Sequence, residues 1–376
     1  MKSRFLKWGN NTVGTINDDM SVDFFDAGIN RSVASVVGNT AKWSPAEFYS
    51  FLCERIVSKS RRDIEHILHR CGLLEYNAFD IADITHAINA SDLFWTAENS
   101  DDDFESAMTE VLNNIFKLNI DAKGNTIDTP EGQNIKRYGV YNGRYGIFKK
   151  RLAPVCSDTE SEIACYKLAL NLGISCCPVY KADDNTIFSQ FEYNFGTEFI
   201  VHMRHILKHR SEDTYEYQNI LNIRPQYKND ILKTMILDYI TYQDDRHLSN
   251  IAVKYDKNDN ESFYPLYDNG RSLFYNETSE TMDFIVKDKI KNAPSFGFIG
   301  TYYDQILELI SNNDIPLDNI INIKNTKNDI HVILKESGIK GEHLYYCLEW
   351  AYNTYNIIIN INNAKNYFIE NKLLQS

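Results

Sequence analysis

The sequence predicts an α+β fold in which a small, sheet-rich lobe joins a larger helical lobe. An extra, mostly helical N-terminal domain precedes the two lobes along the chain. The chain has 376 residues, 43% of them hydrophobic, so at about 150 residues per domain it should form two or three units. Strand-like alternation is concentrated near the middle of the chain, whereas helical periodicity prevails on both sides. We therefore expect domains at 1–125, 126–191 and 192–376, the last with helices at 227–242 and 341–373.

Helices dominate the expected N-terminal domain. Short alternating pieces come first, and then Ser44 offers a helix N-cap that is followed by Pro45 and an early acid. A further helix should end at Gly72, since glycine is a common helix stop, and another should span 79–89. The hydrophilic stretch 121–133 contains two glycines and a proline, and it is the main expected domain boundary.

The middle lobe is defined by two strands, a helix and two more strands. These elements are expected at 137–141, 144–150, 159–172, near 179 and at 187–191. In the second strand, alternation places Lys149 and Lys150 on opposite faces, and we assign Lys149 to the cleft side. The alternative is that both are solvated lysines of an edge strand. On the following helix, Glu162 is the first candidate for a carboxylate that holds Lys149, and Glu160 is the second.

Two segments carry the chemistry, namely DRHLSN at 245–250 and LYDNG at 266–270. Phosphoryl transfer needs a group that orients the acceptor hydroxyl, ligands for magnesium and a cation on the phosphates. Asp245 in a tight loop suits the first role. Asn250 and Asp268 offer the oxygen ligands that Mg²⁺ prefers.

The stretch between these segments should bring them together. Residues 251–255 alternate as a strand, and 256–260 are rich in turn residues, which predicts a hairpin. The apolar run 263–267 should be a strand that ends at Asp268. Either motif alone arises by chance in many proteins, but their ordered combination is far less common.

A turn before the strands contains Thr129 and Gly132, where backbone N–H groups could cover nucleotide phosphates. The turn at 129–133 has one glycine, so a generic surface turn is an equally good interpretation of the local sequence.

Taken together, these segments resemble the HipA-like kinases. The shared pattern comprises Thr129-x-x-Gly132-x-x-x-Lys136, the Phe148-Lys149 strand, Glu162-x-x-Cys165-x-x-Leu168-Ala169-x-x-Leu172-Gly173-Ile174, Asp245-x-His247-x-x-Asn250 and Tyr267-Asp268-Asn269-Gly270. The resemblance covers residues 126 to about 310 and implies a protein-kinase-like bilobal fold, ATP with Mg²⁺, and Ser or Thr hydroxyls of proteins as acceptors. The better-known members are bacterial toxin kinases with small DNA-binding antitoxins, so an antitoxin-like protein is a candidate partner.

The resemblance also implies a role for each matching residue. Asp245 would be the catalytic base, and Asn250 and Asp268 would bind magnesium. Lys149 would bind the phosphates and serve catalysis, with Glu162 as its ion-pair partner.

Further implied roles concern the nucleotide and the N-terminal region. Ser189, Gln190 and Phe191 would form the hinge beside adenine. The family often autophosphorylates a serine in its glycine-containing loop, and the matching residue here is Thr129. The first 120 residues do not resemble the small β-rich module that begins the better-known members. Their segments at 55–61 and 91–95 instead resemble uncharacterised bacterial relatives.

Two other functions stay open at this point. The loop DRHLSN also resembles that of phosphoinositide kinases, although the acidic net charge of −13 and the lack of a basic amphipathic segment argue against a lipid acceptor. A pseudokinase that regulates a partner is the non-enzymatic alternative. The presence of all the acid and amide groups that a metal site needs argues against it.

Charge and cysteine content indicate which partners and which cellular compartment to expect. The net charge of −13 argues against direct nucleic-acid binding as the main function. Seven cysteines without a CxxC pair are typical of a reducing cytoplasm rather than of a disulfide or zinc framework. The N-terminus lacks a signal-peptide core and no run of about 18 apolar residues occurs, so we expect neither export nor a membrane span.

Overall fold

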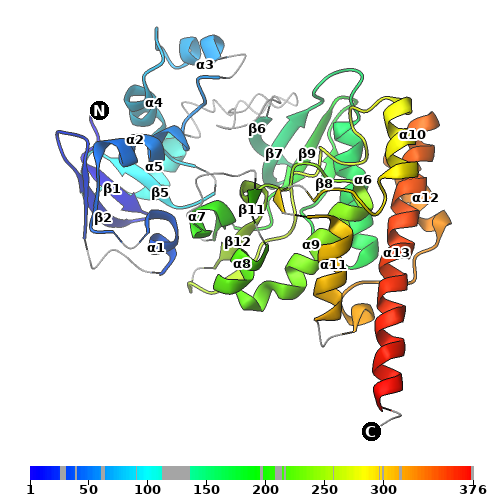
Figure 1. Ribbon diagram of the computed structural model, residues 1–376. Coiled ribbons are helices and arrows are strands. Elements are labelled where there is room, and N and C mark those ends of the chain that lie inside the picture. The colour runs from blue at the N-terminus through cyan, green and yellow to red at the C-terminus, as the bar shows by residue number, and fades with distance from the viewer. Residues whose placement is uncertain are drawn as a thin grey trace. The chain divides into compact units, whose positions relative to one another are not determined.

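The computed structural model describes most of the chain (Figure 1). The described residues are 1–25, 31–38, 40–60, 64–89, 91–111, 136–194, 198–207, 214–215, 217–256, 258–295, 297–298, 300–312 and 316–373. They form two compact units. Unit 1 comprises Met1–Lys150, Gln190–Val201 and Val253–Ser262, and unit 2 comprises Arg151–Ser189, His202–Ala252 and Phe263–Ser376. The predicted division into three domains stays a prediction, and its first boundary lies outside the described residues.

Unit 1 begins with a five-stranded antiparallel sheet in the order β4-β3-β2-β1-β5. The strands are β1 (Phe5–Trp8), β2 (Asn11–Ile16), β3 (Val22–Phe24), β4 (Lys42–Trp43) and β5 (Phe94–Ala97). The prediction of a mostly helical region missed this sheet. Its short strands become recognisable only through pairing, because β1 uses β5 from the far end of the region as its second partner.

Helices cover the rest of this region. They are α1 (Arg31–Val37), α2 (Pro45–Cys53), α3 (Ile64–Arg70), α4 (Ala78–Thr85) and α5 (Phe104–Glu110). The predicted N-cap is confirmed, because Ser44 accepts from the Glu47 amide while the Glu47 carboxylate accepts from the Ser44 amide. Helix α4 ends earlier than predicted, since His86 adopts a left-handed conformation with φ 50°.

A buried ion pair connects the two N-terminal segments singled out by sequence. Arg55 donates to both carboxylate oxygens of Asp92, at 2.6 and 2.7 Å, and to the carbonyls of Ala87 and Phe94. The planar fork of a guanidinium suits such an arrangement of acceptors. The segments at 55–61 and 91–95 therefore have a structural role in the N-terminal fold.

The remaining strands of unit 1 form a hairpin and a small sheet. The hairpin pairs β6 (Lys136–Tyr141) with β7 (Arg144–Lys150) through Asn142 and Gly143, which both have positive φ. The small sheet contains β10 (Phe199–His202), β12 (Ala252–Tyr255) and β13 (Glu261–Phe263) in the order β10-β12-β13. The hairpin predicted after residue 251 is confirmed by the pairing of β12 with β13, and the strands predicted at 137–141 and 144–150 correspond to β6 and β7.

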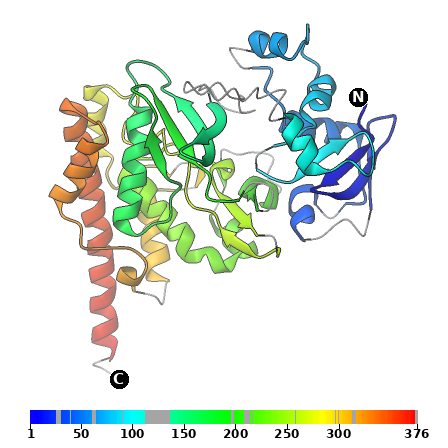
Figure 2. The ribbon, with the colours of Figure 1, turned by 180° about the vertical axis from the view of Figure 1, so that it is seen from behind.

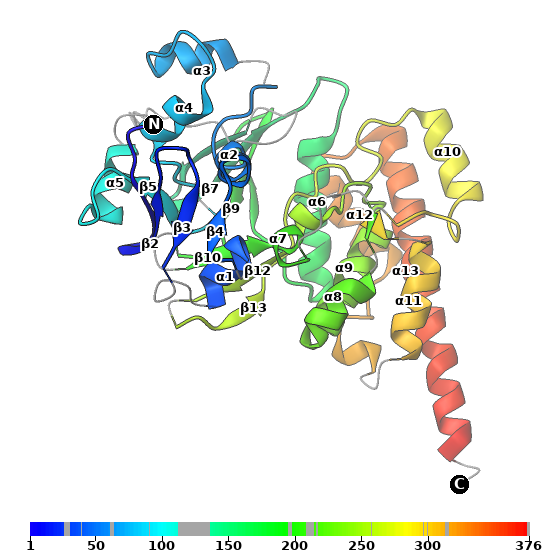
Figure 3. The ribbon, with the colours of Figure 1, turned by 60° about the vertical axis from the view of Figure 1, so that its left-hand side comes forward.

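Unit 2 is mainly helical (Figure 3). Its helices are α6 (Asp158–Leu172), α7 (Met203–Leu207), α8 (Tyr217–Ile223), α9 (Lys228–Thr241), α10 (Ser279–Asp288), α11 (Tyr302–Ser311), α12 (Lys327–Glu336) and α13 (Gly341–Leu373). Short 3-10 turns lie at Pro225–Tyr227, Leu248–Asn250 and Leu317–Asn319. Its strands are β8 (Val179–Lys181), antiparallel to β9 (Thr186–Gln190), and β11 (Thr214–Tyr215), parallel to β14 (Gly297–Phe298).

Helix α9 is the centre of unit 2. Ten of the eleven residues from Ile231 to Thr241 are buried, so no face of these turns is left to solvent. Helices α6, α11 and α13 pack against α9. Trp350 of α13 donates its indole N–H to the carbonyl of Tyr239, at 2.7 Å. The C-terminal turns of α13 extend past the other helices of the unit (Figure 2). No helix among the described residues is both long and apolar enough to cross a membrane.

Candidate active site

The loop that follows α9 starts from an enclosed helix end. Tyr242 ends α9 in a left-handed conformation with φ 49°, and the chain then turns into residues 243–250. A left-handed residue at this place redirects the chain sharply. The loop and the Asp268 turn both belong to unit 2, so their mutual geometry is defined by the contacts of one compact body.

Arg246 anchors the loop to α9. Its side chain and that of Asp238 are both fully buried, and the guanidinium donates through Nε and Nη2 to the two carboxylate oxygens at 2.9 to 3.2 Å. A buried arginine requires such paired, planar acceptors, because unpaired charge in the interior is costly. The loop is therefore fastened to the most buried helix of the unit.

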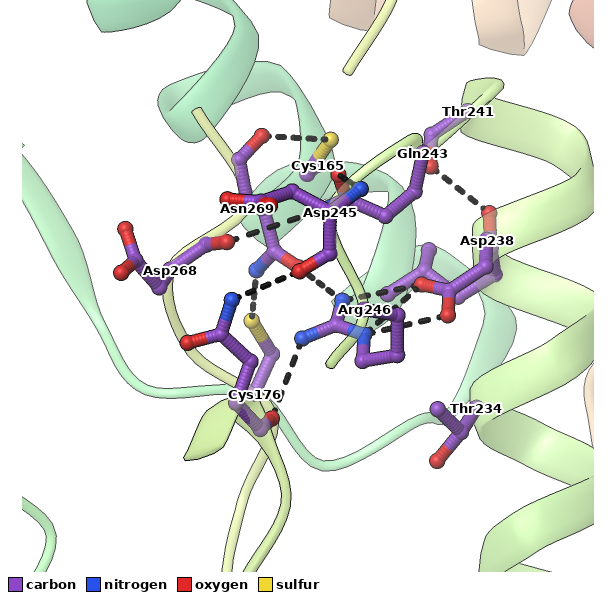
Figure 4. A network of polar contacts seen from close by, with 12 residues as sticks. Cys165, Cys176, Thr234, Asp238, Thr241, Gln243, Asp245, Arg246, Asp268 and Asn269 are labelled. Carbon is purple, nitrogen blue, oxygen red and sulfur yellow. Dashed lines mark hydrogen bonds and ion pairs between the residues drawn. The ribbon is translucent and has the colours of Figure 1, made fainter. Parts of the chain in front are cut away.

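The same guanidinium reaches both segments that sequence had singled out (Figure 4). Nη1 donates to the carbonyls of Asn250, at 3.3 Å, and Tyr267, at 2.9 Å, while Nη2 donates to Oδ1 of Asn269. Arg246 thus holds the backbone beside Asp268 and the backbone of Asn250 in one cluster.

Gln243 provides a second bridge. Its Oε1 accepts from the Asp245 amide at 3.0 Å, and its Nε2 donates to the Asp268 carbonyl at 3.5 Å. The Gln243 carbonyl accepts from the hydroxyl of Tyr302 on α11, at 3.0 Å. Sequence reasoning missed this residue, because nothing in its spacing distinguishes it from an ordinary loop glutamine.

Asp245 is accessible from solvent but held by neighbours. Its side chain is 23% exposed, with Arg271 Nη1 at 3.3 Å and His247 Nε2 at 4.0 Å from Oδ1. His247 Nε2 also lies 3.4 Å from Asn250 Nδ2, so this histidine contacts the loop at both Asp245 and Asn250.

The Asn250 amide has a defined orientation. Nδ2 donates to the Asp245 carbonyl at 2.7 Å, so the amide oxygen is directed to the other side. That oxygen accepts no hydrogen bond from any part of the chain that the structure describes. It is thus available as a ligand.

Asp268 does not follow a strand, and this part of the prediction is wrong. Strand β13 ends at Phe263, and only an isolated bridge between Leu266 and Cys176 continues the pairing. Asp268 instead adopts a left-handed conformation with φ 56°, a strained state for a residue other than glycine. Figure 4 shows its carboxylate pointing away from the Arg246 cluster.

The residues present fit a magnesium ion. Mg²⁺ is commonly held by one or two carboxylates together with phosphate oxygens and water. Asp268 supplies a carboxylate and Asn250 an oriented amide oxygen. Within the described ranges, no group of three or more His, Cys, Asp and Glu side chains is arranged to hold a metal by itself.

Helix α6 places Glu162 beside the Asp268 turn. Glu162 is buried, and a Cβ added to Gly270 would lie 3.0 Å from its Oε2. Glu160, the second candidate partner for Lys149, is instead bound by both Nη atoms of Arg151, at 2.7 and 2.5 Å. Glu162 remains the candidate, and the predicted ion pair with Lys149 stays a prediction because the two residues belong to different units.

The predicted nucleotide residues lie in different parts of the chain. Lys149 is buried on β7 in unit 1, whereas Lys150 is exposed. Ser189 ends the unit 2 segment and Gln190 begins the next segment of unit 1, so the predicted hinge coincides with a passage between units. Phe191 stacks on Tyr193 at 5.0 Å between ring centroids. Thr129 and Gly132 lie outside the described residues.

Asp244, which precedes the proposed base Asp245, has a raised pKa. Burial, opposed by Arg271 and reinforced by the negative charge of Asp245, raises the pKa of Asp244 to about 6. Arg271 Nε lies 3.1 Å from Asp244 Oδ1, yet this oxygen accepts no hydrogen bond from the described part of the chain. The contact is therefore an ion pair without the alignment of a hydrogen bond. Sequence reasoning missed both Asp244 and Arg271, although they adjoin the two motifs.

Comparisons with known proteins identify the fold. The Helicobacter pylori proinflammatory kinase CtkA aligns with a TM-score of 0.51 and 15% identity, over 65% of this chain and 99% of its own. The toxin-antitoxin complex of Shewanella oneidensis MR-1 with HipA, HipB and operator DNA contains a chain that aligns with a TM-score of 0.55 and 11% identity, over 97% of this chain and 99% of its own. No protein-family model and no curated protein matches the sequence.

The second alignment also concerns the N-terminal region. Because it covers 97% of this chain, it includes most of the first 120 residues, which were expected to differ from the start of the better-known members. In this structure those residues contain the five-stranded sheet of unit 1. At these identities the likeness establishes the fold, and the chain is a mixed α/β protein with a HipA-like kinase fold.

Proposed function

We propose that this protein is an ATP- and Mg²⁺-dependent phosphotransferase of the HipA-like kind, acting on Ser or Thr hydroxyls of another protein. The observation that supports it best is the double bridge made by Arg246 and Gln243, which joins the Asp245 loop to the Asp268 turn. Such a bridge holds an acidic group and two oxygen ligands in a fixed relation, as phosphoryl transfer requires.

Each residue would contribute a limited task. Asp245 would orient the acceptor hydroxyl and accept its proton. Asn250 and Asp268 would hold Mg²⁺, which when bound neutralises charge on the phosphates. Lys149, supported by Glu162, would bind phosphate oxygens and so serve catalysis.

The nucleotide would use the remaining predicted residues. Ser189, Gln190 and Phe191 would line the adenine side, and the turn with Thr129 and Gly132 would cover the phosphates. Thr129 would be the matching site for autophosphorylation. A small antitoxin-like protein is the proposed partner, and a toxin role in a two-protein module is the corresponding biological function.

Nucleotide binding and phosphate transfer by the purified protein test the proposal. We expect ATP to raise the melting temperature only with Mg²⁺, and radiolabelled phosphate to reach the protein itself or a generic Ser/Thr acceptor such as casein. Vesicles with phosphatidylinositol serve as the lipid arm. Transfer to lipid alone would favour the phosphoinositide-type alternative, and nucleotide binding without transfer or ATP hydrolysis would favour a pseudokinase.

Point variants make the test specific. Asp245→Ala should lower transfer at least about 100-fold and leave nucleotide binding nearly intact. Asp268→Ala should also weaken the Mg²⁺-dependent part of binding. Asp288→Ala, at an exposed position on α10, is the matched control and should retain wild-type rates. Absence of both binding and transfer in the wild type would falsify the assignment.

A further inference from the structure

Arg271 lies between two neighbouring carboxylates at the solvent side of the candidate active site. Its Nε is 3.1 Å from Asp244 Oδ1 and its Nη1 is 3.3 Å from Asp245 Oδ1. The arginine side chain is 49% exposed, Asp244 is 44% exposed and Asp245 is 23% exposed. One cation thus links a residue with no assigned role to the proposed base.

Arg271 is itself held in place. Its guanidinium lies 5.8 Å from the ring centroid of Tyr275, over the ring face, and its carbonyl accepts from the Asp244 amide at 3.3 Å. The Tyr275 carbonyl in turn accepts from the Ser157 amide at 2.8 Å, which ties this segment to the start of α6. A guanidinium between a ring face and two carboxylates has fewer orientations than a solvated one.

The sequence position of Arg271 links the Asp268 turn to the Asp245 loop. It directly follows the Asp268-Asn269-Gly270 turn, so the same short segment carries the proposed metal ligand and the cation on Asp245. Contacts that fix the position of this turn therefore also fix the position of Arg271 relative to Asp245. The buried Arg246 holds this turn from the core side, and Arg271 contacts the loop from the solvent side.

The positive charge of Arg271 offsets the repulsion between the Asp244 and Asp245 carboxylates. Two adjacent carboxylates repel each other, and without a cation between them at least one would turn away or take up a proton. Burial is the main cause of the raised pKa of Asp244, and the negative charge of Asp245 adds to it. Arg271 keeps the Asp245 carboxylate near its neighbour in spite of the repulsion.

We propose that Arg271 is a positioning residue that orients the Asp245 carboxylate for the acceptor hydroxyl, with Asp244 and Tyr275 as its supports. The inference rests on the proposed phosphotransferase function and adds a determinant of rate to it. The fork of an arginine can contact Asp244 and Asp245 at once, whereas a lysine at this position has a single point of charge.

Kinetics separates this role from a merely structural one. In Arg271→Met we expect kcat for transfer or ATP hydrolysis to fall about 10-fold to 100-fold, while KM for ATP stays within about twofold. Arg271→Lys should recover part of the loss. Asp244→Asn should show a smaller fall, because it removes the support and leaves the cation on Asp245. Arg144→Met, at an exposed position of β7, is the matched control with unchanged rates.

A second measurement does not depend on activity. The urea midpoints of wild type, Arg271→Met, Asp245→Asn and the double variant form a cycle, in which the two single shifts should fail to add. Additive shifts together with an unchanged kcat in Arg271→Met would overturn the inference. An inactive wild type would contradict the proposed function alone, and the cycle would then still decide whether Arg271 holds Asp245.

Discussion

Among single residues, Arg246 joins helix α9 to both segments of the candidate site. It is fully buried, and its hydrogen bonds reach Asp238 on α9 and both functional segments. Its position inside the DRHLSN motif was visible in the sequence, but its direction was not. A side chain between a proposed base and a histidine could equally well have faced the substrate.

Replacing Arg246 should reveal this role. Arg246→Met leaves Asp238 buried without a partner, so we expect the free energy of unfolding to fall by about 3–5 kcal/mol, as measured by urea denaturation. The double variant Asp238→Leu with Arg246→Met should regain much of that stability, because no charge is left unpaired. Nucleotide binding with Mg²⁺ should stay weak in the double variant, since the bridge to Tyr267 and Asn250 is still missing. Recovery of both properties would contradict the bridging role.

Asp244 should make stability depend on pH. Burial raises its pKa to about 6, compared with about 4 in an unfolded chain. Between these values the folded protein holds more protons than the unfolded chain, so this group lowers stability as the pH rises from about 4 to 6, and the loss persists above that range. The charged groups that act on it are Arg271, Asp245 and Glu277.

Asp244→Asn mimics the protonated form. Its melting temperature should therefore exceed that of the wild type by about 1–3 °C at pH 8, and the difference should vanish near pH 4. Thermal denaturation at the two pH values checks this. A lower melting temperature than the wild type at pH 8 would mean that the ion pair with Arg271 outweighs the cost of burial.

At the scale of elements, α6 and the Asp268 turn approach each other closely. Gly270 allows this approach, because a Cβ there would lie 3.0 Å from Glu162 Oε2 and 3.5 Å from the Asp158 carbonyl. Glycine is needed for space at this position, since Gly270 is not among the residues with positive φ.

Gly270→Ala should move the turn away from α6. We expect a loss of about 1–2 kcal/mol in the free energy of unfolding, together with weaker Mg²⁺-dependent nucleotide binding. Gly173→Ala is the matched control, because Gly173 ends the same helix with φ 71° and its added Cβ meets only Asn322 N, at 4.0 Å. The control should lose a similar amount of stability through backbone strain and keep nucleotide affinity. Equal nucleotide affinity in both variants would count against the coupling of the turn to α6.

At the scale of the whole molecule, the proposed function requires both units. The proposed base and metal ligands belong to unit 2, whereas Lys149 belongs to unit 1. Substitutions in either unit therefore test the proposal. Two adjacent lysines of β7 offer a test.

Lys149→Met should weaken ATP binding about 10-fold or more, because Lys149 is the buried lysine and the proposed phosphate ligand. Lys150→Met should stay within about twofold of the wild type, since Lys150 is exposed. Isothermal titration with ATP and Mg²⁺ measures both. Equal losses would indicate general electrostatic attraction, and a loss confined to Lys150→Met would reverse the assignment of the two faces.

Periodicity and residue type were enough to predict many of the local elements and the chemical groups of the candidate site. Helix α13, helix α6 with its end before Gly173 and the strands β6 and β7 follow from hydrophobic periodicity and a stop glycine, which are local signals. The oxygen donors Asn250 and Asp268 follow from residue type and order. The folded structure was needed to show that β1 pairs with β5 and that Asp268 lies in a left-handed turn. It was also needed to show that Arg246, Gln243 and Arg271 contact the loop. These features depend on contacts between segments distant in the chain, which leave no periodic trace in either segment alone.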